Sequence, residues 1–534
     1  MKKTLLYLFL ISSLSIFSQN EDAWVYFNDK PNSATYLSNP LTMLSQRALD
    51  RRTAQGIALT IQDVPVYQPY INQIDAVNGI TVLAKSKWLN CVHVRGLQTD
   101  INALTSLSFV NNIYWANNSW NRTANNQQIA INKKLETTTN FNYGTSANQI
   151  QMLNGHLLHQ QNYTGTGKVI AVLDAGFPNV DIAQPFQRLI TNNLILGGYD
   201  FVNRNNNFYT GDSHGTLVLS CMGGYKDGQL IGTAPDAAYY LYITEDVNSE
   251  NPVEESYWVE AAEEADRVGV DIITSSLGYF GYDNPSYSHS YSDMTGNKNF
   301  ASKGANIAFS KGIIIVASAG NAGTTNVPQI GVPAEATNVI AVGAVQANRN
   351  YASFSSIGPS FDGRVKPDVM AQGQNAVLSN TAGTITTANG TSFSGPIMAG
   401  MIASFWQAVP TLTNQQVVNF VKQSADRFTN PDPQYGYGIP NFETALNTAL
   451  GINSNPISNF ELQQSTNENS IRIIFTNDYK DIKITLFNIL GQDVLEKNIL
   501  HPYQTIDLSS INSGIYIYKI QTNNVSKTGK ILIK

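Results

Sequence analysis

Cysteine and charged residues are both scarce in this chain of 534 residues. Its two cysteines, Cys91 and Cys221, exclude a disulfide framework. They fall in segments that we expect to form different domains, so two buried free thiols are favoured over one bridge. Charged residues make up 13% of the chain, which is about half of the ~25% typical of globular proteins. The formal net charge is −6 and no block of Lys or Arg is present, so nucleic acid is not expected as a partner.

Long apolar runs are rare too, and the first of them lies at the N-terminus. The sequence MKKTLLYLFLISSLSIFSQN carries two lysines, then an apolar segment from Leu5 to Leu14, then small residues near Ser18. This order is typical of a secretory signal peptide, which we assign to residues 1–18. Serines interrupt the run well before the ~20 apolar residues of a membrane span, and no later segment is apolar enough for one. We therefore expect an exported protein without a membrane span.

Residues 19–145 are predicted to form a small α+β domain and a linker. The segment 116–128, ANNSWNRTANNQQ, is rich in Asn and poor in apolar residues, which predicts a linker or an exposed processing segment. The elements expected before it are a strand at AWVYF (23–27), a helix at LSQRALDRR (44–52), and alternating β runs at GITVLAKS (79–86) and CVHVRG (91–96).

In residues 146–450 the pattern changes to apolar β runs that alternate with helix-length segments. The runs are nearly continuous rather than alternating, which is typical of strands buried on both faces of a parallel sheet. We therefore predict an α/β domain with a mostly parallel central sheet flanked by helices. The runs are KVIAVLD (168–174), AAYYLYI (237–243), DIITSSLG (271–278), GIIIVASAG (312–320) and NVIAVGAV (338–345).

One helix of this domain carries clear start signals, in NPVEESYWVEAAEEADRVG (251–269). Asn251 is placed to cap the helix, and Pro252 suits its first position. Glu254 and Glu255 fall in the first turn, where the helix dipole favours negative charge.

The α/β pattern ends near residue 450. Residues 451–460 are predicted to be a linker, and residues 461–534 to form a small all-β domain, which we expect to be a β-sandwich. Its β runs are IRIIF, DIKITLFN, QTIDLSS, GIYIYKI and KILIK.

Three residues with acid–base or nucleophilic chemistry stand at informative places. Asp174 ends a buried strand, at the sheet edge where α/β proteins place their sites. An apolar helix follows His214. Ser392 opens another helix after a glycine, where the positive helix end stabilises a developing oxyanion. Each has an ordinary alternative, namely a turn-forming Asp, a structural His and an N-cap hydroxyl. Taken singly, none of the three is decisive.

Their order and their surrounding motifs remove that ambiguity. His214 and Ser392 follow Asp174 by 40 and 218 residues, in the chain order Asp, His, Ser that is recorded for subtilisin. The accompanying motifs are VIAVLDAG (169–176), SHGT (213–216), SSLG (275–278), ASAGNAG (317–323), NVIAVGAV (338–345), VKPDVMAQG (365–373), GTSFSGP (390–396) and YGYGIPN (435–441). With these motifs, the segment from about 146 to 450 resembles the subtilisin-like serine proteases, or subtilases.

The resemblance implies a secreted serine endopeptidase that acts through a covalent acyl-enzyme. Ser392 would be the nucleophile, His214 the general base and acid, and Asp174 the residue that orients the imidazole. The side-chain amide of Asn321 and the backbone N–H of Ser392 would form the oxyanion hole.

The resemblance also implies a pocket for the residue that precedes the scissile bond. Its walls would be formed by Ser276, Leu277, Gly278, Ala319 and Gly320, with Gly331 at its base. A glycine at the base leaves a deep, uncharged pocket, so we predict a preference for large apolar or aromatic side chains.

The sequence departs from the family pattern in three places. Ala175 stands where the family usually has Ser or Thr, and Leu217 follows His-Gly-Thr where it usually has a second His. Phe393 and Ser394 follow the nucleophile in place of the usual Met and Ala. None of these changes removes a catalytic atom, so they bear on packing and substrate preference.

The flanking segments carry resemblances of their own. By position and α+β pattern, residues 19–145 resemble the propeptide of secreted subtilases, with a permanent accessory domain as the alternative. Residues 461–534 resemble the sorting domain of type IX secretion cargo, through LFNILGQDV (486–494), IDLSSINSGIYIYKI (506–520) and KTGKILIK (527–534). The expected partners are therefore protein or peptide substrates and the secretion machinery of the outer membrane. The alternative for the last domain is a small β-sandwich that binds substrate.

The sequence disfavours two other functions. A pseudoenzyme that binds peptides without cutting them is disfavoured because all four catalytic positions are filled. An acid protease of the sedolisin type, with Glu in place of His, is disfavoured by His214 and Asn321. Many subtilases bind structural calcium, but the sequence has no Asp-x-Asp-x-Asp-Gly loop, so no metal ligand is assigned and no cofactor is expected to be required.

Overall fold

The computed structural model describes two compact units, at 1–450 and 451–534. Residues 1–19 and 118–140 are not described, so the predicted signal peptide and most of the Asn-rich segment lie outside the described residues. The described ranges are 20–117, 141–451, 460–465, 470–475, 482–488, 491–501, 504–521 and 526–533.

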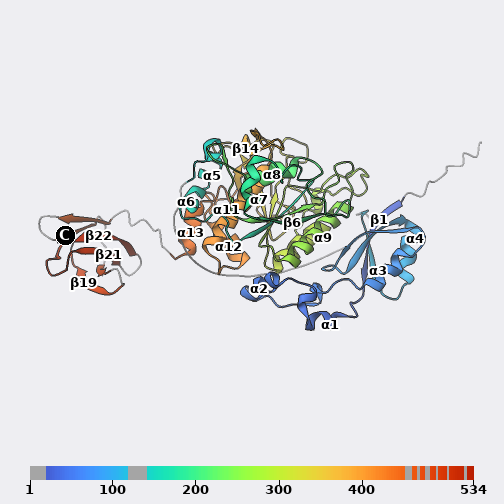
Figure 1. Cartoon of the computed structure of the whole chain (residues 1–534), viewed down its shortest axis with the longest axis horizontal. Coiled ribbons are helices and arrows are strands. Elements are labelled where there is room, and N and C mark those ends of the chain that lie inside the picture. Colours follow the sequence, from blue (N-terminus) through green and yellow to red (C-terminus); the bar gives the residue numbers. More distant parts are fainter. Residues whose placement is uncertain are drawn as a thin grey trace, which may run out of the picture. The chain divides into compact units, whose positions relative to one another are not determined.

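A seven-stranded sheet forms the centre of the first unit (Figure 1). Its strand order is β13-β12-β11-β10-β5-β9-β6, and all six pairings are parallel, as the continuous apolar runs predict. The strands are β5 (Val169–Asp174), β6 (Ile195–Asp200), β9 (Ala238–Ile243), β10 (Ile272–Ser275), β11 (Ile314–Ser318), β12 (Val339–Val345) and β13 (Val369–Gln372).

Both faces of this sheet are buried under helices. On β5, Ile170 and Val172 belong to the apolar cluster that includes residues of α8 (His214–Gly223) and α11 (Thr391–Ala408). Ala171 and Leu173 belong to the cluster on the opposite face, with α9 (Val253–Val268) and α10 (Phe300–Ser310). Alternate residues of one strand thus enter different cores, which is why the sequence reads as an unbroken apolar run.

Smaller elements complete the α/β domain. Two short hairpins pair β7 with β8 and β14 with β15. These elements are α5 (Ala147–Gln151), α6 (Gly155–His159), α7 (Gln187–Thr191), β7 (Tyr225–Lys226), β8 (Leu230–Ile231), β14 (Ala376–Ser379), β15 (Ile385–Ala388), α12 (Asn414–Gln423) and α13 (Phe442–Ala449).

The predicted start of α9 is wrong in two respects, and the first is that Pro252 is the N-cap residue rather than the first helical residue. Asn251 makes no side-chain cap bond, because its Oδ1 atom accepts a hydrogen bond from Arg95 at 3.3 Å. The carboxylate of Glu254 instead reaches back and accepts the backbone N–H of Asn251 at 2.9 Å. Glu254 and Glu255 do fall in the first turn, but both are buried rather than solvated.

The N-terminal domain is a four-stranded antiparallel sheet of order β2-β3-β1-β4. One face is covered by its own helices, and the other lies against α9 and α10, where the rings of Trp24 and Phe300 stack 4.7 Å apart. Its elements are β1 (Asn20–Phe27), α1 (Ser33–Ser38), α2 (Gln46–Ala54), α3 (Gln68–Asp75), β2 (Ile80–Ser86), β3 (Cys91–Leu97), α4 (Gln98–Ala103) and β4 (Val110–Trp115).

Both cysteines are buried free thiols, as predicted. Burial raises the pKa of Cys221 to about 12, so this thiol is protonated and unreactive at neutral pH.

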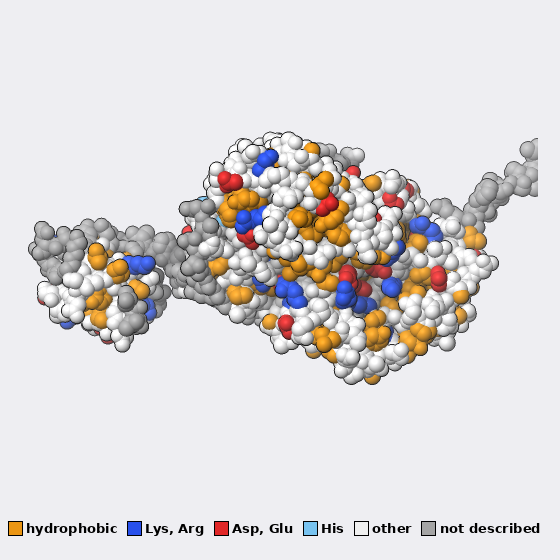
Figure 2. Space-filling model, viewed as in Figure 1, with side chains coloured by type: hydrophobic (Ala, Val, Ile, Leu, Met, Phe, Trp, Pro, Cys, Tyr) orange, Lys and Arg blue, Asp and Glu red, His pale blue; other side chains and the backbone are white. Residues whose placement is uncertain are grey.

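Buried charges fasten the N-terminal domain to the last turns of α9. Arg51 and Arg52, both on α2, bracket the carboxylate of Asp266 with N–O distances of 2.5 and 2.7 Å. Arg52 also reaches Asp63 at 2.8 Å, and all four side chains are at most 5% exposed. Figure 2 shows basic and acidic side chains gathered along this boundary. The cationic groups also lie at the negative end of the α9 dipole.

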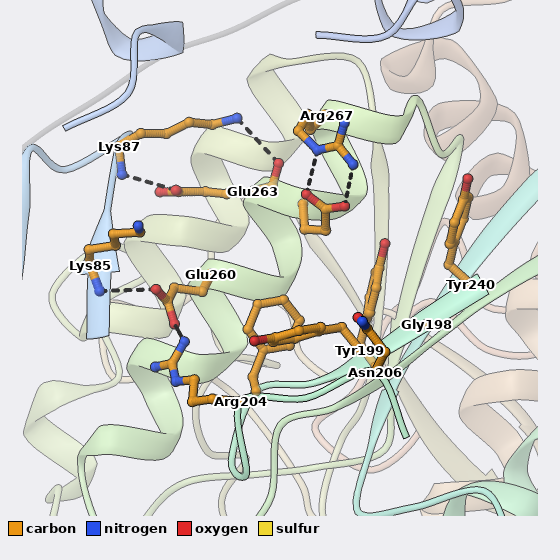
Figure 3. Close-up of a pocket in the computed structure, with 13 residues that line it drawn as sticks. Lys85, Lys87, Gly198, Tyr199, Arg204, Asn206, Tyr240, Glu260, Glu263 and Arg267 are labelled. Atoms are coloured by element: carbon orange, nitrogen blue, oxygen red, sulfur yellow. Dashed lines mark hydrogen bonds and ion pairs between the residues drawn. The ribbon is translucent and has the colours of Figure 1, made fainter. Parts of the chain in front are cut away.

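A second set of contacts holds the turn after β2 (Figure 3). The carboxylate of Glu263 accepts the backbone N–H groups of Lys87 and Trp88, each at 2.9 Å, and that of Glu260 accepts the N–H of Lys85 at 3.1 Å. Glu260 also pairs with Arg204. A cavity of about 510 Å³ opens beside these residues, and two ion pairs line it, Arg204 with Glu260 and Arg267 with Glu264.

The second unit is all-β, as predicted. Its two antiparallel sheets have the orders β16-β17-β20 and β19-β18-β21-β22, and both contribute apolar residues to one small core. The strands are β16 (Phe460–Ser465), β17 (Ser470–Phe475), β18 (Ile482–Phe487), β19 (Asp493–Ile499), β20 (Gln504–Asp507), β21 (Gly514–Gln521) and β22 (Ser526–Ile533). In the part of the chain that the structure describes, no helix is both long enough and apolar enough to cross a membrane.

Candidate active site

Asp174 and His214 meet at the carboxyl edge of the central sheet. Asp174 is the last residue of β5 and is fully buried, and His214 is the first residue of α8. The Nδ1 atom of His214 lies 2.7 Å from Oδ1 of Asp174, which also accepts the N–H of Ala175 at 2.8 Å. The carboxylate thereby fixes which edge of the imidazole faces the protein interior.

The environment of this pair favours a protonated imidazole. The negative charge of Asp174 raises the pKa of His214 above its ordinary value, and burial acts in the opposite direction without cancelling the effect. The His214 side chain is 31% exposed, whereas that of Asp174 is 0% exposed. One member of the pair is thus open to a ligand and the other is shielded from water.

Ser392 is the second residue of α11 and lies two residues after Gly390, the N-cap of this helix. Gly390 has φ 156°, a conformation that favours glycine over residues with a Cβ. Pro396 lies four residues after Ser392 and has no N–H, so the Ser392 carbonyl lacks its usual helical donor. The hydroxyl of Ser276 supplies a replacement, donating to that carbonyl at 2.9 Å.

Asn321 is held against the start of α11 by its side-chain oxygen. That oxygen accepts the backbone N–H of Thr391 at 2.9 Å and its hydroxyl at 3.0 Å. Thr391 is fixed in turn by the N–H of Gly320, which donates to the same hydroxyl at 3.1 Å. Among the described residues the amide nitrogen of Asn321 has no hydrogen-bond partner, so a donor is left beside Ser392.

The helices that carry His214 and Ser392 approach each other at this edge. The ring of His214 lies 6.1 Å from that of Phe393, the residue after Ser392. Within the described residues the Ser392 hydroxyl makes no hydrogen bond to His214. Catalytic hydrogen bonds are often long or poorly aligned in enzymes without substrate. The neighbouring Ser394 is different, because its buried hydroxyl donates to the Thr391 carbonyl.

A cavity of about 550 Å³ opens at Asn321. Four of the six residues expected in the substrate pocket line it, namely Gly278, Ala319, Gly320 and Gly331. The other two do not: Ser276 binds the Ser392 carbonyl, and Leu277 is a buried member of the apolar core.

Three residues of this region were not foreseen from the sequence. Thr391 links Asn321 to α11, Phe393 lies beside His214, and Phe280 lines the cavity next to Gly331. The sequence carried a usable signal for a different contact, that of Ser276: a proline four residues after Ser392 implies that another group must donate to the Ser392 carbonyl.

One group of side chains in the described residues has the composition of a metal site. It consists of Glu245, Glu250 and Glu254, in and next to the loop between β9 and α9. None of these three residues was singled out as a metal ligand from the sequence.

Three family models match successive parts of the chain. The model described as "Subtilase family" matches residues 165–438, which is about half of the chain. The model "Peptidase S8 propeptide domain, Bacteroidota" matches residues 22–133, and the model "Secretion system C-terminal sorting domain" matches residues 467–534.

Curated proteins similar to this chain align with the same central region. Subtilisin DY of Bacillus licheniformis is 32% identical over 298 residues, which cover 55% of this chain and 97% of that protein. Serine protease AprX of Bacillus subtilis is 30% identical over 319 residues, covering 54% of this chain and 67% of that protein. Among solved structures, that of MycP1 from the ESX-1 type VII secretion system is 22% identical with a TM-score of 0.44, covering 60% of this chain and 90% of that one.

Proposed function

The chain belongs to the subtilase family, and we propose from this premise that it cleaves peptide bonds through Asp174, His214 and Ser392. Family membership makes it a serine-type endopeptidase. The assignment of roles to individual residues is the proposal, and the observation that carries it is the 2.7 Å contact between Asp174 and His214 beside the start of α11.

The proposed reaction has two stages. His214 accepts the hydroxyl proton of Ser392 as its oxygen attacks the substrate carbonyl, and then gives that proton to the leaving amine. Water hydrolyses the acyl-enzyme by the same route. Asp174 holds the imidazole in the required tautomer and stabilises the imidazolium that forms.

The oxyanion of each tetrahedral intermediate would lie between two donors. One is the amide nitrogen of Asn321, and the other is the backbone N–H of Ser392 in the first turn of α11. The bonds from Thr391 to the oxygen of Asn321 support this role, since they fix the amide with its nitrogen available. Donors positioned before the reaction do not need to reorganise as charge develops.

The test is labelling and turnover in a matched pair of variants. Ser392→Ala should abolish both labelling by a fluorophosphonate and hydrolysis of denatured casein, while Ser394→Ala should retain both. The control is informative because Ser394 is buried with its hydroxyl bonded to the Thr391 carbonyl. Hydrolysis by the purified Ser392→Ala variant at the wild-type rate would overturn the assignment.

We propose that the cavity at Asn321 binds the side chain before the scissile bond. Its lining by glycines and Phe280, without a charged residue, supports a preference for large apolar or aromatic side chains. Mapping the cleavage sites in a denatured protein tests this, and cuts mainly after Lys or Arg would refute it.

The two flanking domains indicate that the protein is secreted or displayed at the cell surface. The N-terminal domain is a peptidase propeptide domain, and the sorting domain marks the chain for secretion or display at the cell surface. We propose that the N-terminal domain is cut away at or near the Asn-rich segment 116–128. We also propose that the C-terminal domain is recognised by the type IX secretion machinery. Mass spectrometry of the active secreted form tests the first proposal, and an intact N-terminus near Gln19 would refute it. Deleting residues 460–534 should retain the protein in the periplasm.

A further inference from the structure

The N-terminal domain contacts α9 through the main chain of one short segment, residues 83–88, LAKSKW. The carboxylates of Glu260 and Glu263 accept three backbone N–H groups of this segment at 2.9–3.1 Å. The guanidinium of Arg204 donates to one of its backbone carbonyls at 2.6 Å. We call Glu260, Glu263 and Arg204 the α9 cradle. The groups that it binds here are present in any peptide, so the cradle does not require the sequence of the N-terminal domain.

The same face of α9 depends on the N-terminal domain for its positive charge. In the part of the chain that the structure describes, all hydrogen bonds and ion pairs of the Glu263 and Asp266 carboxylates come from that domain. The partners of Glu263 are Ser86, Lys87 and Trp88, and those of Asp266 are Arg51, Arg52 and Lys87. Glu260 keeps a partner in the catalytic domain, Arg204. Without the N-terminal domain, Glu263 and Asp266 therefore favour a cationic ligand.

The segment leaves open the cavity of about 510 Å³ that lies beside it. Lys85 and Lys87 stand on one side of this cavity, and Tyr199 and Tyr240 stand on the other (Figure 3). Tyr242 also lines it, with a side chain that is 2% exposed and a hydroxyl that makes no hydrogen bond to any described residue. Buried polar groups are nearly always hydrogen-bonded, so this hydroxyl indicates a ligand group that the N-terminal domain does not supply.

We propose that the α9 cradle and this aromatic cavity form a second peptide-binding site on the mature peptidase, and that its ligand is an extended, basic segment of a protein substrate. The main chain of that segment would take the place of residues 83–88. Its cationic side chains would neutralise Glu263 and Asp266, and one that enters the cavity would contact the tyrosine rings and donate to the Tyr242 hydroxyl. The proposal rests on the proposed removal of the N-terminal domain, because only then is the site open.

This site is separate from the proposed catalytic residues. Residues of α9 belong to the apolar cluster on one face of the central sheet, and those of α11, which carries Ser392, belong to the cluster on the other. A substrate bound at α9 would stay attached to the enzyme while its other segments reach Ser392. Such attachment raises the effective concentration of those segments at the catalytic residues.

The test measures peptide binding to the secreted, processed form, after its serine has been blocked with a fluorophosphonate. The probe is a fluorescein-labelled decapeptide of alternating alanine and lysine, and binding is followed by fluorescence anisotropy. We expect the probe to bind, and to bind more weakly as NaCl is raised from about 0.05 to about 0.5 M. The same peptide with glutamate in place of lysine should bind weaker by about tenfold or more.

Two comparisons locate the bound probe. Glu263→Gln should weaken its binding by about tenfold or more, whereas Glu443→Gln should not, although it removes the same charge. Glu443 lies on α13, whose apolar residues pack on the other face of the sheet. The full chain carrying Ser392→Ala, in which residues 83–88 cover the cradle, should also bind the probe about tenfold more weakly or not at all. This second comparison decides the matter if Glu263→Gln does not fold.

The proposal is overturned if the processed enzyme does not bind the lysine peptide, or binds the lysine and glutamate peptides equally. It is overturned as well if Glu263→Gln or the full chain binds the probe with the affinity of the processed parent. Mass spectrometry separates these results from a failure of the proposed processing. An N-terminus near Gln19 in the active form would refute both, since the cradle would then stay covered.

Discussion

The buried charges between α2 and α9 lead to a quantitative prediction for Asp266→Ala. The carboxylate of Asp266 is fully buried and is shared by Arg51 and Arg52 at 2.5 and 2.7 Å. Its removal leaves two guanidinium groups buried beside each other, and in the described part of the chain the Arg52–Asp63 pair is then the one ion pair that they keep. Breaking a buried pair from one side typically costs about 3–5 kcal/mol, because the remaining charge loses its compensation without regaining water.

The assay is urea unfolding of the Ser392→Ala chain, followed by tryptophan fluorescence from Trp24 and Trp88 in the N-terminal domain. With an m-value of about 3 kcal/mol per M, the expected cost lowers the urea midpoint of that domain by about 1–2 M.

Glu264→Ala provides the matched control for this assay. Glu264 lies on the same helix and pairs with Arg267, but water reaches both side chains, which are 30% and 50% exposed. Exposed pairs contribute about 0.2–1 kcal/mol, so this midpoint should fall by less than about 0.3 M. Equal midpoints for Asp266→Ala and Glu264→Ala would refute the claim that the arginine pair on α2 fastens the N-terminal domain.

Three further predictions concern the active site. Because the charge of Asp174 raises the pKa of His214 and only the neutral imidazole accepts a proton, the acid limb of kcat/KM should lie above pH 6.5. Asp174→Asn should move this limb to lower pH while lowering kcat, and an unmoved limb would contradict the coupling. Asn321→Ala should lower kcat by about 100- to 1000-fold, the loss known for the equivalent subtilisin donor, with KM nearly unchanged; a change mainly in KM would exclude the oxyanion role. Ser276→Ala should lower kcat about tenfold, because it leaves the Ser392 carbonyl unbonded. Ser276→Thr should restore kcat. Full activity of the alanine variant would show that this bond does not position Ser392.

The sequence predicted strands and the ends of elements correctly where the order of residues within one segment determines them. Continuous apolar runs predicted the parallel strands, and Asp174 does stand at the carboxyl end of β5. Likewise His214 and Ser392 both lie in the first turn of a helix. Such positions depend on the order of residues along one segment.

Local patterns could not predict contacts between segments that are distant in the sequence. Glu254 and Glu255 do lie in the first turn of α9, as predicted, but the sequence did not reveal that both are buried. Asn251 was expected to cap α9, yet its side chain binds Arg95 of the N-terminal domain. In both cases the deciding partner comes from another segment that covers the helix, and nothing within residues 251–269 reveals it.

The carboxylates along α9 affect how the mature enzyme behaves in solution after the N-terminal domain is removed. The N-terminal domain, which we expect to be removed by cleavage, covers Glu260, Glu263 and Asp266. This side of α9 is therefore in contact with protein before cleavage and with water afterwards. Exposed apolar side chains at these three positions would promote association of the mature enzyme, whereas carboxylates become hydrated once the domain is removed. Salt should therefore weaken rebinding of the released domain, and the mature peptidase should stay monodisperse as its propeptide accumulates.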